Sequence, residues 1–423
     1  MVRQGPVVLH RPWQRNPVVI LGFVLWVAML AFGLQGFVER MQSDALFSDL
    51  QSWMPWGLWV ASYIWFIGLS AGSFLLSTLV YVFGLKRLER VGKLALVVAL
   101  ITLIMAMMMI AFDVGHMSRL FEIYYRPQFH SMMAWMGWLY GAYFLLLVFE
   151  TYFVLHADFV NGRALAGGQG AVARFLSFGR RESLTERDLR RDRRIVGVLA
   201  TIGIPLAFAF HGGVGALFGT VDARDVWHTG LYPIIFLTGA FLTGGALFTS
   251  IFAFFWPNQD GAWREIVLTL AKIVLVLLLF DVLLEWADLS IPLWYGIGPE
   301  VAELKYMLFG PFWWSFWGVS LTAGVIVPLL LLTIGRNSPK AISWAGVLIV
   351  VSYLATRVNL VVPGLQSPEL PNLQYSYHDG RLLYHYVPTW SEWELVLFVC
   401  ALGIALLVIA ARVLPSIMGR ELS

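Results

Sequence analysis

The sequence predicts an all-α integral membrane protein with about ten transmembrane helices and with both termini in the cytoplasm. Hydrophobic residues make up 59% of the 423 residues and charged residues only 13%, and the mean hydropathy is +0.74. A soluble domain carries about 25% charged residues, so a chain this apolar cannot cover itself with polar surface in water. The 19 tryptophans fit the aromatic belts that lie at both membrane interfaces.

Ten segments are long and apolar enough to cross a bilayer, which takes about 20 mostly apolar residues. They lie at residues 18–38, 56–84, 93–115, 131–156, 195–218, 230–256, 264–289, 312–334, 340–361 and 393–414. Most connections between them are short, and the long ones are 157–194, 290–311 and 362–392.

The distribution of Lys and Arg predicts the orientation. With ten spans, the termini and alternate loops on one side hold 21 of the 29 Lys and Arg residues, and the opposite loops hold six. Cytoplasmic loops carry the excess of positive charge, so the first set is predicted to be cytoplasmic. The bias also supports an even number of spans, because an odd number would mix the two sets.

The connection 157–194 is rich in arginine and ends in a run of alternating charges at 180–194. Such a run could be a docking site for a cytoplasmic partner. It could also be a solvated surface helix, bridged by its own ion pairs, that fixes the topology beside anionic lipid. The sequence favours the second interpretation.

A weak internal repeat predicts two parallel four-helix bundles. Residues 70–77 in the second span and 243–250 in the sixth are both patches of small residues, which let helices approach closely. Both spans run from outside to inside. The predicted organisation is therefore an N-terminal segment with a flanking helix at 1–55, a first bundle at 56–218, a second bundle at 219–361, and an outer loop with the last flanking helix at 362–423.

Composition also excludes several kinds of site. The chain has one cysteine, Cys400, which excludes an intrachain disulfide, a Cys-ligated iron–sulfur cluster and a structural zinc site within this chain. No span carries the paired histidines of a di-haem cytochrome b, so we expect neither metal nor haem. The net charge of +3 is too small to suggest a nucleic-acid partner. We expect the chain to be surrounded by phospholipid.

Charges at membrane depth are costly, so each is a functional hypothesis. Asp113 closes the third span, His116 follows three residues later, and His130 opens the fourth span from the same side. Spacing of three residues would place Asp113 and His116 on one helix face. A carboxylate beside an imidazole suits quinone chemistry, because one can relay a proton and the other can bind a carbonyl. The alternative is an interfacial cap near the headgroups.

A second group of charges lies further along the chain. Lys272, Asp281 and Glu285 lie in the seventh span, and Arg357 lies near the outer end of the ninth. Asp281, Glu285 and Asp288 are spaced to form a carboxylate stripe on one helix face. These charges could carry protons across the low dielectric, or Arg357 could form a static salt bridge that holds two helices together. Asp288 is close enough to the surface to be simply solvated.

The outer loop before the last span is predicted to contain a β-hairpin at 373–386. Asp379-Gly380 is a type I′ turn signal, and tyrosines alternate on both arms. Such a hairpin could be a platform for a partner subunit or a lid over the end of the bundle.

Several short motifs together resemble the membrane subunits of the NrfD/PsrC type. They are Trp56-Gly57 with Gly68 and Ser70-Ala71-Gly72; Asp113-Val114-Gly115-His116; Arg126-Pro127; Arg357-Val358-Asn359 with Pro363-Gly364; and Tyr386-Val387-Pro388-Thr389-Trp390-Ser391-Glu392. Their order extends over nearly the whole chain. The ten-span length is similar to that of the larger branch, which includes the membrane subunits of hydrogenase-2, of the menaquinone reductase complex and of alternative complex III.

The resemblance implies a quinone-reactive subunit of a respiratory oxidoreductase complex that is not catalytic alone, in a bacterial inner membrane. Electrons would pass between menaquinone or ubiquinone and an extracytoplasmic four-cluster iron–sulfur subunit. That subunit would in turn exchange electrons with a molybdopterin, hydrogenase or multihaem cytochrome subunit. Asp113 and His116 would form the quinone site, with His130 and Arg119 as further candidates for quinone binding. Lys272, Asp281, Glu285 and Arg357 would form a proton pathway that could couple the reaction to proton translocation.

Two other classes of function remain open. A secondary transporter could use the charges of the seventh span for ion coupling, but it usually needs helices broken by Gly or Pro, and the middle of that span has neither. A passive anchor could hold a catalytic partner at the membrane, but such an anchor would hardly need ten spans.

Overall fold

The computed structural model describes residues 17–42, 48–163, 167–178, 182–221, 223–368, 370, 372–376, 379–380 and 382–419. All the regular structure in these ranges is helical. The helices are α1 (Pro17–Gln42), α2 (Leu58–Tyr81), η2 (Lys86–Val91), α3 (Gly92–Asp113), η3 (Met117–Arg119), α4 (Glu122–Tyr125), α5 (Met132–Gly162), α6 (Gly167–Leu176), α7 (Glu186–Gly219), η4 (Asp225–Trp227), α8 (Tyr232–Phe255), α9 (Gly261–Tyr295), α10 (Pro299–Phe309), η5 (Ser315–Ile326), α11 (Val327–Thr333), α12 (Pro339–Gln366), η6 (Leu373–Tyr375), α13 (Trp390–Val413) and η7 (Pro415–Met418).

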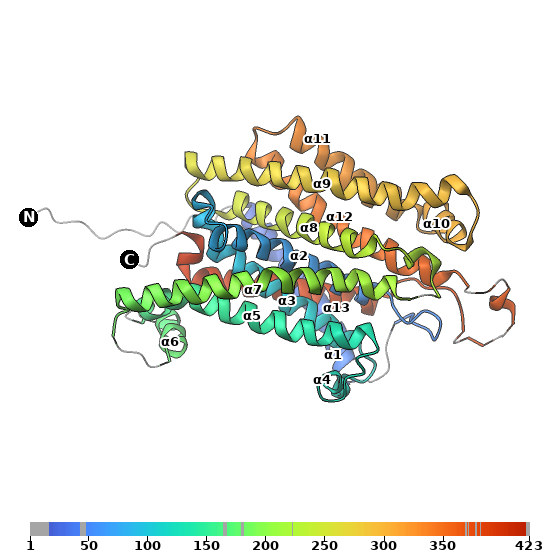
Figure 1. Cartoon of the computed structure of the whole chain (residues 1–423), viewed down its shortest axis with the longest axis horizontal. Coiled ribbons are helices and arrows are strands. Elements are labelled where there is room, and N and C mark those ends of the chain that lie inside the picture. Colours follow the sequence, from blue (N-terminus) through green and yellow to red (C-terminus); the bar gives the residue numbers. More distant parts are fainter. Residues whose placement is uncertain are drawn as a thin grey trace, which may run out of the picture.

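Ten of these helical segments are long and apolar enough to cross a membrane, and each overlaps one predicted span. The prediction of an all-α membrane protein with ten spans is therefore confirmed. Figure 1 shows the spans running roughly parallel, with α6 at one end of the molecule and with α4 and α10 at the opposite end. We call the end with α4 and α10 the outer end. The N- and C-terminal residues 1–16 and 420–423 lie outside the described residues.

The arginine-rich connection is partly a continuation of the fifth span. α7 begins at Glu186, where Thr185 and Asp188 form a reciprocal capping box, so the charged residues from 186 to 194 belong to its first turns. Asp192 is buried there and lies 2.7 Å from Nδ1 of His156 on α5. Arg180 and Arg181 lie outside the described residues.

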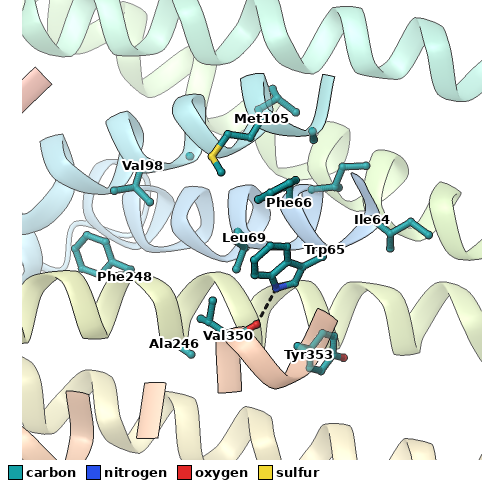
Figure 2. Packing of buried hydrophobic residues seen from close by; sticks show 14 of the residues in the cluster. Ile64, Trp65, Phe66, Leu69, Val98, Met105, Ala246, Phe248, Val350 and Tyr353 are labelled. Atoms are coloured by element: carbon teal, nitrogen blue, oxygen red, sulfur yellow. Dashed lines mark hydrogen bonds between the residues drawn. The ribbon is translucent and has the colours of Figure 1, made fainter. Parts of the chain in front are cut away.

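Helix α2 lies at the centre of the packing. Figure 2 shows Trp65 and Leu69 of α2 among side chains of α3, α8 and α12. Trp65 also donates a hydrogen bond from its indole Nε1 to the carbonyl of Val350 on α12, at 2.8 Å. An indole N–H buried in an apolar core needs such a partner. One central helix is therefore held to both halves of the chain.

The two predicted small-residue patches contact each other. A Cβ atom placed on Gly72 of α2 would lie 2.6 Å from the amide nitrogen of Gly245 on α8, and one placed on Gly244 would lie 2.6 Å from backbone atoms of Gly72. Only glycine allows backbones this close. We call α2, α3, α5 and α7 the first bundle, and α8, α9, η5 with α11, and α12 the second bundle. The glycine crossing joins the two small-residue patches of the proposed repeat; the repeat and the domain boundaries remain predictions.

The first and last spans flank the first bundle. α1 packs mainly against α13, and α13 packs against α3. Gly33 of α1 lies against the backbone of Phe398, and Trp26 donates a hydrogen bond from its indole to the carbonyl of Ala401, at 2.8 Å. Most of the remaining α1 surface is exposed, which is typical of a helix that faces lipid on several sides.

The predicted β-hairpin is wrong. Residues Leu373–Tyr375, which were expected to form one arm, form the short helix η6, and the described part of 373–386 contains no strand. Tyr377, His378 and Arg381 lie outside the described residues. An Asp-Gly turn does not produce a hairpin unless the residues on both sides of it form paired strands.

The segment 382–389, which we call the outer strap, packs over the first bundle instead. The amide nitrogens of Leu383 and Val387 donate hydrogen bonds to the side chains of Gln51 and Asp49, both at 2.9 Å. This arrangement supports the interpretation of the loop as a lid; its use as a docking platform remains a prediction.

The orientation can be tested with introduced cysteines in a Cys400→Ala background. Ser118 at the outer end and Ser183 at the opposite end are both exposed. Because the Lys and Arg bias predicts a cytoplasmic location for residue 183, a membrane-impermeant maleimide should label Ser118→Cys in intact cells. It should label Ser183→Cys only after the membrane is permeabilised. The opposite labelling pattern would invert the topology.

The glycine crossing can be tested with Gly72→Val. The added side chain would overlap the α8 backbone, and overpacking of this kind typically costs about 1–3 kcal/mol or more. We expect a lower thermal midpoint for the purified protein in detergent. The matched control is Gly22→Val on α1, where a Cβ atom meets nothing within 4 Å. Equal stability of the two variants would show that the crossing is not constrained as described.

Candidate functional site

The outer end of the first bundle is built around the last residue of α3, Asp113. The buried side chain of Arg40, from α1, donates hydrogen bonds to the carbonyls of Phe112 and Val114, at 3.0 and 2.7 Å. A cation is favourable at a helix C-terminus because the last carbonyls lack intrahelical partners. Arg40 therefore fixes the position from which the carboxylate of Asp113 extends.

A network from the outer strap closes the same end of the bundle. The hydroxyl of Tyr386 accepts a hydrogen bond from the amide of Leu58 at 2.7 Å and donates one to Glu392 at 2.5 Å. Thr389 and Glu392 form a capping box that starts α13. Burial, followed by the neighbouring Glu392 carboxylate, raises the pKa of Tyr386 above its usual value, so the phenol stays a hydrogen-bond donor.

Gly57 makes this arrangement possible. A Cβ atom on Gly57 would overlap the Tyr386 hydroxyl, so a larger residue would displace the ring. Trp59 adds an indole hydrogen bond to the carbonyl of Glu392, at 3.1 Å. The motifs at 56–57, 113–116 and 386–392 are far apart in the sequence and meet at this one place.

The carboxylate of Asp113 has one buried oxygen, Oδ1, without a hydrogen-bond partner among the described residues. Its charged neighbours include Glu392 and Arg40, and the Tyr63 hydroxyl of α2 is also within its electrostatic reach. A buried acceptor without a partner is costly, by about 1–3 kcal/mol. Such an oxygen can accept a proton or a hydrogen bond from a ligand hydroxyl.

The other predicted residues of this group are more exposed. α3 ends at Asp113, Val114 is extended, and His116 follows in an extended conformation with an exposed side chain. The expectation that Asp113 and His116 share a helix face is therefore wrong. Arg119 and His130 are also exposed at this end. The structure places these three residues around the outer rim rather than beside Oδ1 of Asp113.

In the second bundle, the structure brings Asp281 and Arg357 close through a tyrosine that the sequence analysis did not select. The hydroxyl of Tyr353 donates to Asp281, at 3.1 Å to Oδ2, and accepts from Nη2 of Arg357 at 3.5 Å. Asp281 and Arg357 are each only 2% exposed. No direct Asp281–Arg357 ion pair forms within 4.0 Å in the described part of the chain, so Tyr353 connects the two side chains by hydrogen bonds.

Arg357 also lies where the two bundles meet. Its guanidinium packs on the rings of Phe236 and Tyr353, at 4.5 and 4.8 Å from the centroids. Together with His211 of α7 it lines a void of about 10 Å³. Nδ1 and Nε2 of His211 face the carbonyls of Ala207 and Ile67, at 2.8 and 3.3 Å.

Asp281, Glu285 and Asp288 all lie in α9, as predicted, but Lys272 does not join them. Lys272 is exposed, and nine residues at about 100° each place it about 180° around the helix from Asp281. It faces away from Tyr353 and Arg357.

A cavity of about 410 Å³ lies at the outer end of the second bundle. It is lined by η4, the start of α8, the end of α9, α10, η5 and α12. Five acidic residues line it: Asp225, Glu285, Asp288, Glu300 and Glu303. Arg357 and Asn359 line it from α12. Neither Asp113 nor His116 contributes to this cavity.

Several functional candidates were missed from the sequence. Glu150 of α5 is fully buried, and both its carboxylate oxygens lack partners among the described residues. A glutamate inside an apolar span could have been selected from the sequence as a functional candidate. Arg40 could have been found in the same way, at the end of the first span. Tyr353 and Glu303 gave no signal, because a tyrosine in a span and a glutamate in a loop are common.

Comparison with known proteins gives consistent relatives over nearly the full length. The model of the family described as polysulphide reductase, NrfD, matches residues 48–369. The chain is 33% identical over 404 residues to a subunit of the selenate reductase of Mesobacillus selenatarsenatis, covering 94% of this chain and 93% of that protein. It is 25% identical to the Hdr-like menaquinol oxidoreductase integral membrane subunit of Archaeoglobus fulgidus, covering 95% and 92%.

A further relative is the integral membrane subunit of menaquinone reductase from Nitratidesulfovibrio vulgaris. It is 21% identical, over 93% of this chain and 91% of that protein. All three relatives are named as subunits of a reductase or an oxidoreductase, and two of them as integral membrane subunits. Their names agree with the resemblance seen in the sequence. The full-length matches give no support to the transporter or passive-anchor alternatives.

Glu303 of α10 provides a test of the cavity's electrostatics. Burial raises its pKa from 4.5 to about 7, opposed by the Val226 amide and by Arg224. Between these two values the folded protein holds a proton that the unfolded chain has lost, so stability falls as the pH rises through this window. Above it, Glu303→Gln should be more stable than the wild type, by up to about 3 kcal/mol.

The difference should disappear below the pKa of the unfolded chain, because both side chains are then neutral. Thermal unfolding of the two proteins, measured at intervals from about pH 4 to pH 8, checks this. A constant difference across this range would show that Glu303 does not titrate with folding.

Proposed function

This chain belongs to the polysulphide reductase NrfD family, and on that premise we propose that it is the quinone-reactive membrane subunit of a respiratory oxidoreductase complex. The observation that carries the proposal is the unpartnered Oδ1 of Asp113 at the outer end of the first bundle, where three distant motifs meet. The names of relatives such as menaquinone reductase and menaquinol oxidoreductase support a quinone as the substrate. The substrate would be menaquinone or ubiquinone.

Quinol oxidation releases two electrons and two protons, and quinone reduction takes up both. Asp113 would accept a hydrogen bond from one substrate hydroxyl through Oδ1 and take up its proton, and the second proton would leave by way of the histidines of the outer rim. Arg40 would keep the end of α3 in place through its two carbonyl contacts. Tyr386 and Glu392 would keep water of the outer side away from Asp113, because their hydrogen bonds hold the outer strap over the start of α2. His116, His130 and Arg119 on the rim would pass protons to the outer solution or bind the substrate.

The electrons would pass between the quinone and an iron–sulfur subunit docked at the outer end. A four-cluster protein connected to a molybdopterin, hydrogenase or multihaem cytochrome subunit would fit this role. The complex would lie in a bacterial cytoplasmic membrane, with the outer end facing away from the cytoplasm.

The second bundle would provide a proton pathway through Asp281, Tyr353, Arg357 and Glu285. The support is the hydrogen-bonded relay from Asp281 through Tyr353 to Arg357 and the position of Glu285 on the cavity wall. Asp281, Tyr353 and Glu285 would carry the protons, and Arg357, whose guanidinium keeps its own protons, would hold the tyrosine hydroxyl in position. Lys272 lies on the opposite face of α9 and has no part in this pathway.

The proposed role of Asp113 predicts the effect of Asp113→Asn. Asparagine keeps the shape of the side chain but cannot take a proton, and loss of a general acid or base costs about 10²–10⁴ in rate. We expect quinone-dependent turnover of the complete complex in native membranes to fall by about 100-fold or more, with normal assembly. The measurement should include a pH profile.

The matched control is Asp158→Asn in the same bundle. Asp158 pairs with Lys93 at 2.7 Å at the other end of α5, so it should change turnover little. Near wild-type turnover for Asp113→Asn would remove the proton role of Asp113.

A further inference from the structure

The cavity of the second bundle has the properties of a ligand site. Its volume of about 410 Å³ lies in the range of small-molecule pockets, about 300–1,000 Å³. Its walls combine apolar side chains, such as Ile235, Leu304 and Met307, with polar and charged side chains in about equal number. A pocket of this composition binds a ligand with an apolar body and a few hydrogen-bonding groups.

Three of its polar side chains are at least nine-tenths buried and each has an atom without a hydrogen-bond partner. These atoms are Oε2 of Glu303, Nε of Arg357 and Oδ1 of Asn359, in residues that are 5%, 2% and 5% exposed. All three residues line the cavity. The set contains two acceptors and one donor, so the side chains around the cavity include both kinds of hydrogen-bonding partner.

The charges restrict the class of ligand. An anion is disfavoured, because five acidic residues line the cavity beside a single arginine. A metal ion is disfavoured too, because the acidic side chains are dispersed around the space; within the described ranges no three of them, with or without His or Cys, come together as a metal site. A neutral ring with hydroxyl groups on opposite sides matches dispersed acceptors better than a single ion does.

The cavity is also placed for entry from the lipid. Its wall includes Ala287 of α9 and Phe316 and Ser320 of η5. The adjacent Trp286 and Trp317 are 65% and 41% exposed, as in an interfacial belt. The stretch η5 is π-helical, and π-helical turns occur frequently at functional sites. Ser320 there accepts a hydrogen bond from Nδ2 of Asn359, at 3.1 Å, which leaves Oδ1 of Asn359 available.

We propose that this cavity is a second binding site for the head group of a membrane hydroquinone, separate from the site at Asp113. The hydroquinone hydroxyls donate to Asn359 and to the carboxylates, and Arg357 donates to a ring oxygen. The isoprenoid tail leaves between α9 and η5. The identity of the ligand as a membrane quinol rests on the proposed function. The existence of a second site does not, because it is inferred from the cavity and the polar side chains that line it.

The test uses the complete purified complex and a photoreactive azido-naphthoquinone that carries an isoprenoid tail. After reduction of the probe and illumination, mass spectrometry of the peptides maps the labelled residues. We expect labelled peptides from the end of α9 or from α12, in addition to label near Asp113. Excess unlabelled menaquinol should compete at both places, and excess phospholipid should compete at neither.

Two variants reduce second-bundle labelling by different means. Asn359→Leu removes the amide at nearly constant size, and Ala287→Phe fills the cavity while it keeps every polar group. Each should lower labelling of the second bundle by about tenfold, equivalent to about 1.4 kcal/mol of binding, and leave label near Asp113 unchanged. The control, Val276→Phe, lies on the exposed face of α9 and should change neither.

The outcomes separate the two proposals. Label near Asp113 without label in the second bundle overturns the second site and leaves the proposed function intact. Label in the second bundle alone supports the second site and overturns the role of Asp113. Label in the second bundle that phospholipid displaces, or that both variants leave unchanged, shows an ordinary lipid contact and overturns the second site.

Discussion

The close crossing of α2 and α8 is the constraint on which the rest of the structure depends. Gly72 and Gly244 let two backbones come into direct contact, and close packing of this kind is a main source of helix association where lipid removes the hydrophobic driving force. Because the two helices belong to different halves of the chain, this contact sets the distance between the bundles. It also brings Arg357 and His211 to the same small void, so charged groups of one half lie against the other.

The two bundles use their outer ends differently. In the first, Arg40, Tyr386 and Glu392 satisfy nearby backbone groups and leave one carboxylate oxygen of Asp113 unpaired. In the second, five acidic residues, Arg357 and Asn359 surround an open space. We propose a quinol ring at both places, beside Asp113 at the closed end and in the open cavity of the second bundle. The backbones differ there too, because α10 and the π-helical η5 line the open end of the second bundle.

Much of the fold could be predicted from the sequence, because the requirement for long apolar helices in a bilayer leaves few alternatives. The ten spans, the carboxylate stripe of α9 and the small-residue patches all follow from spacing and composition. The failures occurred where structure depends on contacts between distant segments. α3 ends at Asp113, where Arg40 of α1 binds the carbonyls of Phe112 and Val114, and this contact between distant segments cannot be read from the residues around Asp113. The outer strap is fixed by Asp49 and Gln51, more than 300 positions away, so its local hairpin signal was misleading.

The outer strap has a mechanical consequence for assembly. Its tyrosine, Tyr386, lies beneath the strap against Gly57 and is bonded to both Leu58 and Glu392. A subunit that settles on the strap therefore presses on the start of α2 and on the start of α13 together. The proposed partner subunit, docked there, would therefore bear on the hydrogen bonds that lie beside Asp113.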